Sequence, residues 1–242
     1  MSDKDYASPT DHSRRVHAMF AGIAVRYDLL NHLLSGNIDK RWRQRVVRKL
    51  MPILANPEKL VLDVACGTGD LTLALAAVAN AKVVGSDFCR PMLSIAARKA
   101  ESNLAGTPFV EADALSLPFG SESFDAVTIA FGLRNLSSVD RGLVELHRIL
   151  KPGGQLAILE FSEPVIPGFR QLFAFYFSTL LPRVGGWISG SRGAYEYLPD
   201  SVSRFPNQKN LVERMLESGF AAISFENLTG GIAAIHLGVR SE

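Results

Sequence analysis

The chain of 242 residues has the length of one domain, or of one domain with a large insertion. Hydrophobic residues make up 47% and charged residues 21%, a composition typical of a globular protein with a core of its own. A formal net charge of +2 is too small to indicate a nucleic-acid partner, so we expect none.

Cysteine and histidine usage predicts neither a disulfide framework nor a metal site. The two cysteines, Cys66 and Cys89, match no zinc-binding spacing and indicate a reducing compartment. The five histidines form no metal-ligand pattern. The first residues are polar and acidic, unlike a signal peptide, and no apolar run reaches the roughly 18–20 residues that span a bilayer. We therefore expect a cytoplasmic chain.

The N-terminal part is expected to be helical. Residues 1–13 look disordered, residues 14–34 form a helical stretch, and residues 39–51 form a second helix with Trp42 on its apolar side. Basic residues crowd the remainder of that second helix: Lys40, Arg41, Arg43, Arg45, Arg48 and Lys49. They indicate either a solvated helix face or attraction to an anionic membrane surface. Residues 52–57 are expected to form a linker.

A glycine turn then joins a predicted strand to a predicted helix. Residues 60–65 are a mostly apolar run typical of a buried strand, Cys-Gly-Thr-Gly at 66–69 turns the chain, and residues 71–79 read as a helix. This is the opening half of a nucleotide-binding βαβ unit. The dinucleotide fingerprint has a third glycine where this chain has Thr72, which argues against NAD or FAD.

The acidic turn Asp-x-x-x-Gly-x-Gly suits S-adenosylmethionine, which carries adenosine but no phosphate. We expect Asp63 to help order the turn, and the backbone near Gly67 and Gly69 to meet the methionine end of the cofactor. A Gly-x-Gly alone is weak support, and the acidic residues that follow strengthen it.

Two aspartates end the next two predicted strands. Asp87 ends strand 81–87, about 20 residues beyond the glycine turn, where α/β nucleotide folds place the carboxylate that binds the ribose hydroxyls. Its alternative role is to cap the helix at 91–102. Asp113 ends strand 109–113 and, with the backbone of Ala114, is placed to receive the adenine amino group. The alternative for Asp113 is an exposed loop acid.

The remaining elements predict a sheet of seven strands, mainly parallel and with the last strand antiparallel. They are a strand at 125–131, a helix at 139–150 ended by Lys-Pro-Gly-Gly, a strand at 155–161, a helix at 207–218, and strands at 220–227 and 232–239. Residues 162–206 interrupt this alternation. Within them we expect an aromatic helix at 169–181 and a Gly/Ser loop at 189–194.

Seven motifs together resemble the ubiquinone/menaquinone biosynthesis C-methyltransferase family (UbiE/MenG; demethylmenaquinone methyltransferase), over nearly the whole chain after about residue 14. They are Arg-Tyr-Asp-Leu-Leu-Asn at 26–31, Leu-Asp-Val-Ala-Cys-Gly-Thr-Gly-Asp at 62–70, Phe-Gly-Leu-Arg-Asn at 131–135, Leu-Lys-Pro-Gly-Gly at 150–154, Leu-Glu-Phe-Ser at 159–162, Tyr-Glu-Tyr-Leu at 195–198 and Leu-Thr-Gly-Gly-Ile-Ala-Ala-Ile-His at 228–236. The resemblance implies a class I S-adenosylmethionine-dependent methyltransferase: a Rossmann-like α/β fold with N-terminal helices and an inserted helical lid.

The resemblance also implies how the single domain, 1–242, is divided. We expect a tail at 1–13, a helical cap at 14–51, a cofactor-binding core at 58–161, a lid at 162–206, and the last helix and strands at 207–242. In such enzymes the cofactor is held by positions matching Thr68, Asp87, Asp113 and Ala114. Some members have a serine contact where this chain has Ala130, so that contact is missing here.

The implied reaction moves a methyl group from S-adenosylmethionine to a ring carbon of a prenylated quinol. The ring must be electron-rich, so we expect Arg134 to stabilise the phenolate while another group takes the proton. An ion pair of Arg134 with the following helix is the alternative. Asn135 and Tyr27 are expected to orient the reacting groups, and Tyr195 and Tyr197 to line a channel for the isoprenoid tail.

Demethylmenaquinol is the expected acceptor. An enzyme that also methylates 2-polyprenyl-6-methoxy-1,4-benzoquinol in ubiquinone synthesis is the close alternative, and a non-catalytic cofactor-binding scaffold is the remote one. Because the substrate dissolves in membrane, the enzyme is expected to visit the membrane surface transiently without spanning it. A homodimer stays open.

Overall fold

In this computed structural model, the described residues are 11, 14–22, 24, 35–102, 106–166 and 192–241, and of residues 192–196 only the backbone is described. Residues 14–22 are helical. Several expectations lie wholly or partly outside the described residues: the tail at 1–13 apart from Asp11, the end of the helical stretch 14–34 with Tyr27, the aromatic helix at 169–181, and most of the segment 162–191 that was assigned to the lid. The side chain of Tyr195 lies outside them as well.

A seven-stranded sheet forms the centre of the fold, in the order β3-β2-β1-β4-β5-β7-β6. All neighbouring strands pair in parallel except β7, which is antiparallel to both β5 and β6. This confirms the mainly parallel sheet with an antiparallel last strand. The strands are β1 (Leu60–Val64), β2 (Lys82–Asp87), β3 (Phe109–Glu111), β4 (Phe124–Ala130), β5 (Leu150–Phe161), β6 (Phe220–Leu228) and β7 (Ala233–Arg240).

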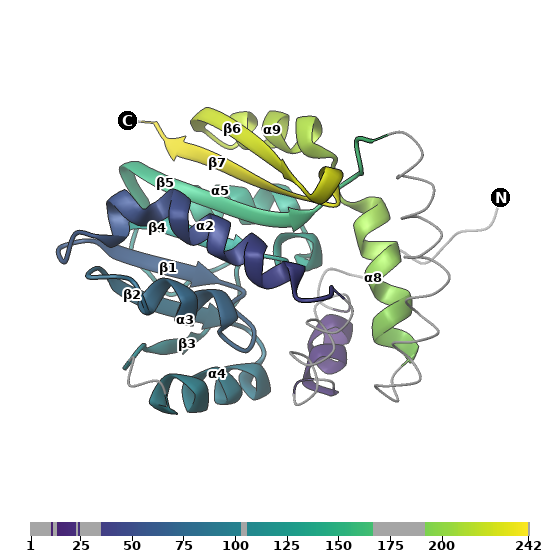
Figure 1. Ribbon diagram of the computed structural model, residues 1–242, viewed down its shortest axis with the longest axis horizontal. Helices are drawn as coiled ribbons and strands as arrows, with labels where there is room; N and C mark the ends of the chain where they lie inside the picture. Colours follow the sequence, from purple (N-terminus) through teal and green to yellow (C-terminus); the bar gives the residue numbers. More distant parts are fainter. Residues whose placement is uncertain are drawn as a thin grey trace.

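Helices cover both faces of the sheet (Figure 1). Their bounds are α2 (Ile38–Leu54), α3 (Asp70–Ala76), α4 (Arg90–Ser102), α5 (Val139–Ile149), α8 (Arg192–Arg204) and α9 (Gln208–Glu217), with short 3₁₀ turns η1 (Leu133–Asn135) and η3 (Thr229–Gly231). One apolar core joins α2 and α3 to the sheet, and a second joins α5 and α9 to its other face. Burial on both faces explains why the central strands read as nearly continuous apolar runs.

Several boundaries differ from the sequence prediction. Helix α2 runs through Pro52 to Leu54, so the expected linker is shorter. Pro52 lacks the N–H that would bond the carbonyl of Arg48, but both residues are exposed, so water can reach that carbonyl. Leu50 and Leu54 keep the last turn of the helix packed on the core. The 151–154 segment belongs to β5, across an irregularity in its pairing with β4, and α8 begins at Arg192, inside the expected Gly/Ser loop.

This architecture gathers the predicted site residues at one edge of the sheet. The parallel strands β1, β2, β4 and β5 end at the same edge, and the turns that follow them carry the glycine motif and the Phe-Gly-Leu-Arg-Asn motif. Helix α8 lies beyond that edge (Figure 1). In open α/β sheets a ligand binds outside the carboxyl ends of the strands.

Candidate active site

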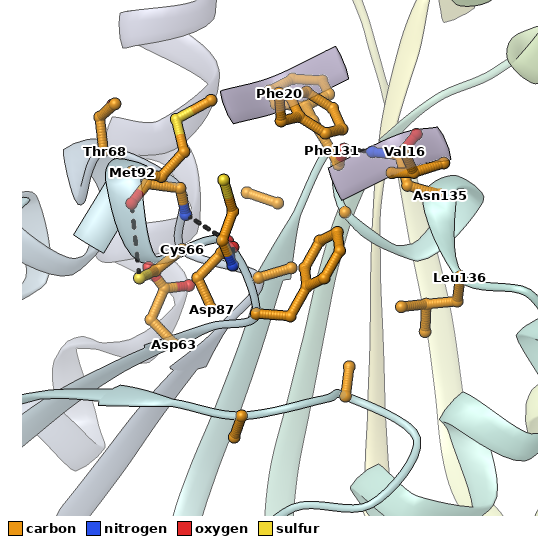
Figure 2. A pocket seen from close by; sticks show the side chains of 18 of the residues that line it. Val16, Phe20, Asp63, Cys66, Thr68, Asp87, Met92, Phe131, Asn135 and Leu136 are labelled. Atoms are coloured by element: carbon orange, nitrogen blue, oxygen red, sulfur yellow. Dashed lines mark hydrogen bonds between the residues drawn. The ribbon is translucent and has the colours of Figure 1, made fainter. Parts of the chain in front are cut away.

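A pocket opens at the carboxyl ends of these strands. Its walls come from the turns after β1, β2, β3 and β4, from α2, and from the helical residues 14–22. Figure 2 shows Val16 and Phe20 from that N-terminal helix opposite Asp63, near the end of β1, and Cys66 in the turn that follows. The lining is thus apolar on one side and rich in carboxylates and backbone amides on the other.

Asp63 is fixed beneath the turn by two threonines. Its Oδ2 accepts from Thr72 Oγ1 and its Oδ1 accepts from Thr128 Oγ1, each at 2.6 Å. Burial raises the pKa of Asp63 to about 6, although the two hydroxyls oppose this. Thr72, which replaces the third glycine of the dinucleotide motif, therefore ties α3 to the end of β1. Asp63 thus joins β1 to the helix that follows the turn and to the neighbouring strand β4, which is compatible with the expected role in ordering the turn.

Gly67 and Gly69 have different roles in the turn: the first leaves its pocket side open, and the second allows close packing against α4. Gly67 has φ +57°, a left-handed conformation, and a Cβ built there would touch nothing, so the pocket side of the turn is open. Gly69 has φ +83°, and a Cβ there would lie 2.9 Å from that of Ala96, which allows the turn to pack against α4. Thr68 is 2% exposed. Burial raises the pKa of the Cys66 thiol well above its ordinary value, which disfavours a nucleophilic thiolate.

Asp87 links the turn to the start of α4. Its Oδ2 accepts from Gly67 N and its Oδ1 accepts from Cys89 N, both at 2.8 Å. The side chain lines the pocket while the residue is 6% exposed, and burial raises its pKa although these backbone N–H groups oppose the shift. Each carboxylate oxygen can accept a second hydrogen bond. The alternative role, a cap of the helix, is met only in part: α4 begins at Arg90, and Asp87 accepts from the N–H of Cys89, the residue before it, while the side chain still faces the pocket.

Asp113 and Ala114 follow β3, which ends earlier than predicted, at Glu111. Asp113 is exposed and its Oδ1 accepts from Leu115 N at 2.9 Å, while Ala114 is 7% exposed. Both line the pocket. The structure therefore brings together all seven predicted cofactor-binding residues at this edge: Asp63, Gly67, Thr68, Asp87, Asp113 and Ala114 in the pocket wall, with Gly69 in the turn behind them.

Arg134 is buried against a partner that the sequence did not indicate. Its Nη1 lies 2.8 Å from Glu160 Oε1 on β5 and also donates to the carbonyl of Phe131. The alternative ion pair is thus present, but with a strand rather than with the following helix. Arg134 Nε is buried and has no hydrogen-bond partner among the described residues. Burial raises the pKa of Glu160, and the Arg134 charge opposes that shift.

Asn135 connects this loop to α8. Its Nδ2 donates to the Phe131 carbonyl at 3.1 Å, and its Oδ1 accepts from Tyr197 OH at 3.1 Å. Burial raises the pKa of Tyr197, so the phenol stays a hydrogen-bond donor. Asn135 and Phe131 line the pocket, whereas Arg134 lies behind its wall. Arg134, Asn135 and Tyr197 were all predicted to act on the quinol. They are joined through the Phe131 carbonyl, to which Arg134 and Asn135 both donate, and through the Asn135 side chain, which accepts from Tyr197.

Two charged residues of the site were missed by the sequence reading. Glu160 is 1% exposed at the end of the apolar strand β5, and a lone acid at that position was a readable signal. Arg43 lines the pocket from α2, and only its spacing of four from Asp39, with which it pairs, hinted at a role.

The basic face of α2 is partly neutralised. Arg45 Nε and Lys49 Nζ lie 2.9 Å and 2.6 Å from the carboxylate of Glu226 on β6, and Arg43 faces the pocket. Lys40 and Arg41 stay exposed. In the described part of the chain, no helix is long and apolar enough to cross a bilayer.

The charged and apolar side chains that line the pocket fit S-adenosylmethionine. Carboxylates at the ends of β1 and β2 suit a ligand with two cationic groups and ribose hydroxyls, and the apolar wall that includes Phe20, Met92 and Leu136 suits adenine. Phosphate-binding glycine geometry is absent from the described turn, where Thr72 is committed to Asp63. The fold and site define a class I S-adenosylmethionine-dependent methyltransferase.

Solved structures agree on the fold. The chain is similar to an S-adenosylmethionine-dependent methyltransferase of Thermotoga maritima, with a TM-score of 0.65, 19% identity, and 93% of this chain and 100% of that chain covered. It is also similar to a Haemonchus contortus phosphoethanolamine N-methyltransferase in complex with S-adenosylhomocysteine, with a TM-score of 0.60, 16% identity, and 83% and 52% covered.

The model of the ubiE/COQ5 methyltransferase family matches residues 9–240, and the chain belongs to this family. A demethylmenaquinone methyltransferase of Thermus thermophilus is 51% identical over 92% of this chain and 100% of its own length. A ubiquinone/menaquinone biosynthesis C-methyltransferase of a Geobacter species is 44% identical over 96% of this chain and 98% of its own length. The chain is therefore a methyltransferase whose cofactor is S-adenosylmethionine.

Proposed function

We propose that this enzyme transfers a methyl group from S-adenosylmethionine to a ring carbon of demethylmenaquinol, giving menaquinol. The observation that carries the proposal is the full-length likeness to relatives named demethylmenaquinone methyltransferase, at 51% identity in Thermus thermophilus and 44% in Deinococcus radiodurans. The acid-rich pocket beside a buried arginine is consistent with this reaction, because methylation of a ring carbon needs a cationic donor next to an activated phenol.

At the cofactor end, we assign Asp87 to the ribose hydroxyls and Asp113, with the Ala114 backbone, to the adenine amino group. Thr68 and the turn at Gly67 and Gly69 are assigned to the methionine end. Bound there, the cofactor supplies an electrophilic methyl group on a positively charged sulfur. The helical residues 14–22 contribute Val16 and Phe20 to the same pocket, which supports a role in excluding water from the reaction.

At the acceptor end, Arg134 is assigned to stabilising the oxyanion of the quinol. The guanidinium lies behind the pocket wall, and the loop residues Phe131 and Asn135 separate it from the pocket, so we assign its effect to the positive charge that it holds beside the site and not to a direct hydrogen bond. The pair with Glu160 fixes the guanidinium in place. Arginine stays protonated, so water or another acceptor takes the phenol proton. Asn135 and Tyr27 are assigned to orienting the ring.

Residues 162–206 are assigned to a lid, with Tyr195 and Tyr197 along a channel for the isoprenoid tail. The contact between Tyr197 and Asn135 supports this assignment, because it places α8 beside the loop that carries Arg134. We also assign residues 14–51 to a cap and residues 58–161 to a core; the described helix at 14–22, helix α2 and strands β1 to β5 support this division.

A second candidate function is dual use on 2-polyprenyl-6-methoxy-1,4-benzoquinol in ubiquinone synthesis. The relative of a Geobacter species, named for both pathways, favours it at 44% identity. For either acceptor we propose a cytoplasmic enzyme that visits the membrane surface, where a prenylated quinol resides. The exposed cations Lys40 and Arg41 are candidates for that contact, and a homodimer is a further proposal.

The test is methyl transfer from labelled S-adenosylmethionine to a reduced, short-tailed demethylmenaquinol, read by product mass. A 2-methoxybenzoquinol analogue runs beside it, and the oxidised quinone serves as the control because its ring is electron-poor. Product from the naphthoquinol alone supports the menaquinone role, and product from both supports dual use. Cofactor binding with no product from either quinol contradicts the proposal.

A further inference from the structure

Arg43 is the cation in the wall of an otherwise acidic pocket. Among the described lining residues it is the only lysine, arginine or histidine, and it comes from α2 rather than from a turn of the sheet. The same wall carries four aspartates: Asp63, Asp70, Asp87 and Asp113. The side chain of Arg43 is 11% exposed, so water screens its charge only weakly.

The described pocket wall offers four carboxylates for the positive groups of S-adenosylmethionine but one cationic side chain for its negative group. The cofactor's sulfonium and ammonium groups are positive and suit the aspartates, but its α-carboxylate is negative and needs a donor or a cation. Two backbone donors of the glycine turn are already engaged, because Gly67 N donates to Asp87 and Gly69 N donates to the Cys66 carbonyl at 2.9 Å. A cationic side chain is therefore the strongest remaining receptor in the described wall.

The surroundings of Arg43 leave it able to take that role. Its Nη1 pairs with Asp39 one helical turn away and lies 3.7 Å from Asp70 Oδ2. Both contacts use the same terminal nitrogen, whereas a guanidinium offers five N–H donors in a planar fork. Asp70 is held independently by Lys99 Nζ at 2.8 Å. The guanidinium carbon lies 5.9 Å from the centre of the Phe131 ring, which places the charge over a pocket residue.

We propose that Arg43 binds the α-carboxylate of S-adenosylmethionine and makes the pocket selective for a cofactor with an intact amino-acid end. An arginine fork matches both carboxylate oxygens, which a lysine does not. The aspartates on the other side receive the positive groups. Arg43 is thus a binding and specificity-determining residue, and its assignment depends on the cofactor and not on which quinol accepts the methyl group.

The test compares two ligands by calorimetry: S-adenosylmethionine and decarboxylated S-adenosylmethionine, which lacks only the carboxylate. The full chain is expected to prefer the intact cofactor by about 10- to 100-fold, the range of a hydrogen-bonded charge pair. In Arg43→Gln the affinity for S-adenosylmethionine should fall by about that factor, while the affinity for the decarboxylated ligand should change by less than about threefold.

Arg45→Gln is the matched control. Arg45 lies two residues further along α2, is half-exposed and pairs with Glu226, so this change should leave both affinities as they are. Arg43→Gln removes an ion-pair partner of the buried Asp39, which keeps its hydrogen bond from Ser35 Oγ. Asp39→Asn/Arg43→Gln removes both charges and serves if the single variant does not fold. An equal loss for both ligands, or no loss for either, overturns the proposal. Because binding is the readout, failure of quinol methylation would not affect this result.

Discussion

The two ends of the pocket are held by different parts of the fold. At the cofactor end, Asp63 and Asp87 accept hydrogen bonds from threonine hydroxyls and backbone amides that belong to the sheet, its turns and the start of α4. At the acceptor end, Arg134 is held by Glu160 on β5, and Asn135 by Tyr197 on α8. The first end forms with the core, whereas the second also requires α8 to dock.

This difference predicts that changes at one end spare the other. Helix α8 lies beyond the edge of the sheet and follows a long interruption of the α/β alternation, while β1, β2 and α3 share one apolar core (Figure 1). Cofactor binding should therefore survive changes at Arg134 or Tyr197. Turnover of the quinol should depend on both ends.

The largest effect is expected at Arg134. Arg134→Ala should lower kcat by about 100-fold or more, because it removes the buried positive charge beside a developing oxyanion, while the affinity for S-adenosylmethionine changes by less than about threefold. The measurement is quinol turnover beside cofactor titration. The change also leaves Glu160 buried and unpaired, so Arg134→Ala/Glu160→Gln separates the two effects: it should recover stability but not turnover. Recovery of turnover in the double variant would contradict the assignment.

Asp63 offers a pH test of the cofactor end. Its pKa is about 6, against 3.8 for an ordinary aspartate, so ionisation of Asp63 lowers the free energy of unfolding. Because the folded pKa is raised, Asp63 favours the folded state most below pH 3.8, and that advantage is lost as the pH rises through 6. At 1.36 kcal/mol per pH unit the interval is worth about 3 kcal/mol.

The matching measurement is urea unfolding of the wild type and Asp63→Asn between pH 4 and pH 7.5. The stability of the wild type relative to the variant should decline by about 2.4 kcal/mol across this range, because part of the full effect is already lost at pH 4, and should level off above about pH 7. A difference that does not change with pH would show that Asp63 is not held in the buried, proton-binding setting described here.

Asp87→Asn is expected to weaken cofactor binding by about 10- to 100-fold, because an amide keeps one acceptor oxygen where a carboxylate has two. Asp87 serves both Gly67 N and Cys89 N, so the variant must leave one of these groups or the ribose unpaired. Titration with S-adenosylmethionine measures the effect. Asp200→Asn, an exposed change on α8, is the control and should bind the cofactor normally. Unchanged affinity in Asp87→Asn would remove Asp87 from the cofactor site.

The smallest effect is expected for Tyr197→Phe. Losing one neutral hydrogen bond, the 3.1 Å contact to Asn135 Oδ1, is worth about 0.5–1.5 kcal/mol, or a decrease of about 2- to 10-fold in kcat/KM for the quinol. Cofactor affinity should not change. A decrease in cofactor affinity of the same size would contradict the independence of the two ends.

Most of the fold was predictable because local patterns and topology agree. The alternation of apolar strands with helices predicted the seven-stranded sheet, and the acids at its carboxyl edge predicted the residues that gather there. Helix ends that are determined by tertiary packing were not predictable. From the sequence, Pro52 predicts the end of the helix. In the structure α2 continues to Leu54, because Leu50 and Leu54 are anchored in the core.

The missed charges at the site have the same origin. Arg43 reads as one of several cations on a basic helix, and only the packing of α2 across the sheet turns it toward the pocket while Arg45 and Lys49 pair with β6. Glu160 was readable as a lone acid in an apolar strand, but its partner lies 26 residues away in sequence. Long-range pairs of this kind are set by strand order, which places β4 beside β5.

The most direct test of the two-ended account is a paired measurement on Arg134→Ala/Glu160→Gln: binding of S-adenosylmethionine, and methyl transfer to reduced demethylmenaquinol in the same preparation. The account predicts wild-type cofactor affinity within about threefold together with a loss of turnover of about 100-fold or more. Wild-type turnover, or a loss of cofactor affinity as large as the loss of turnover, would contradict it.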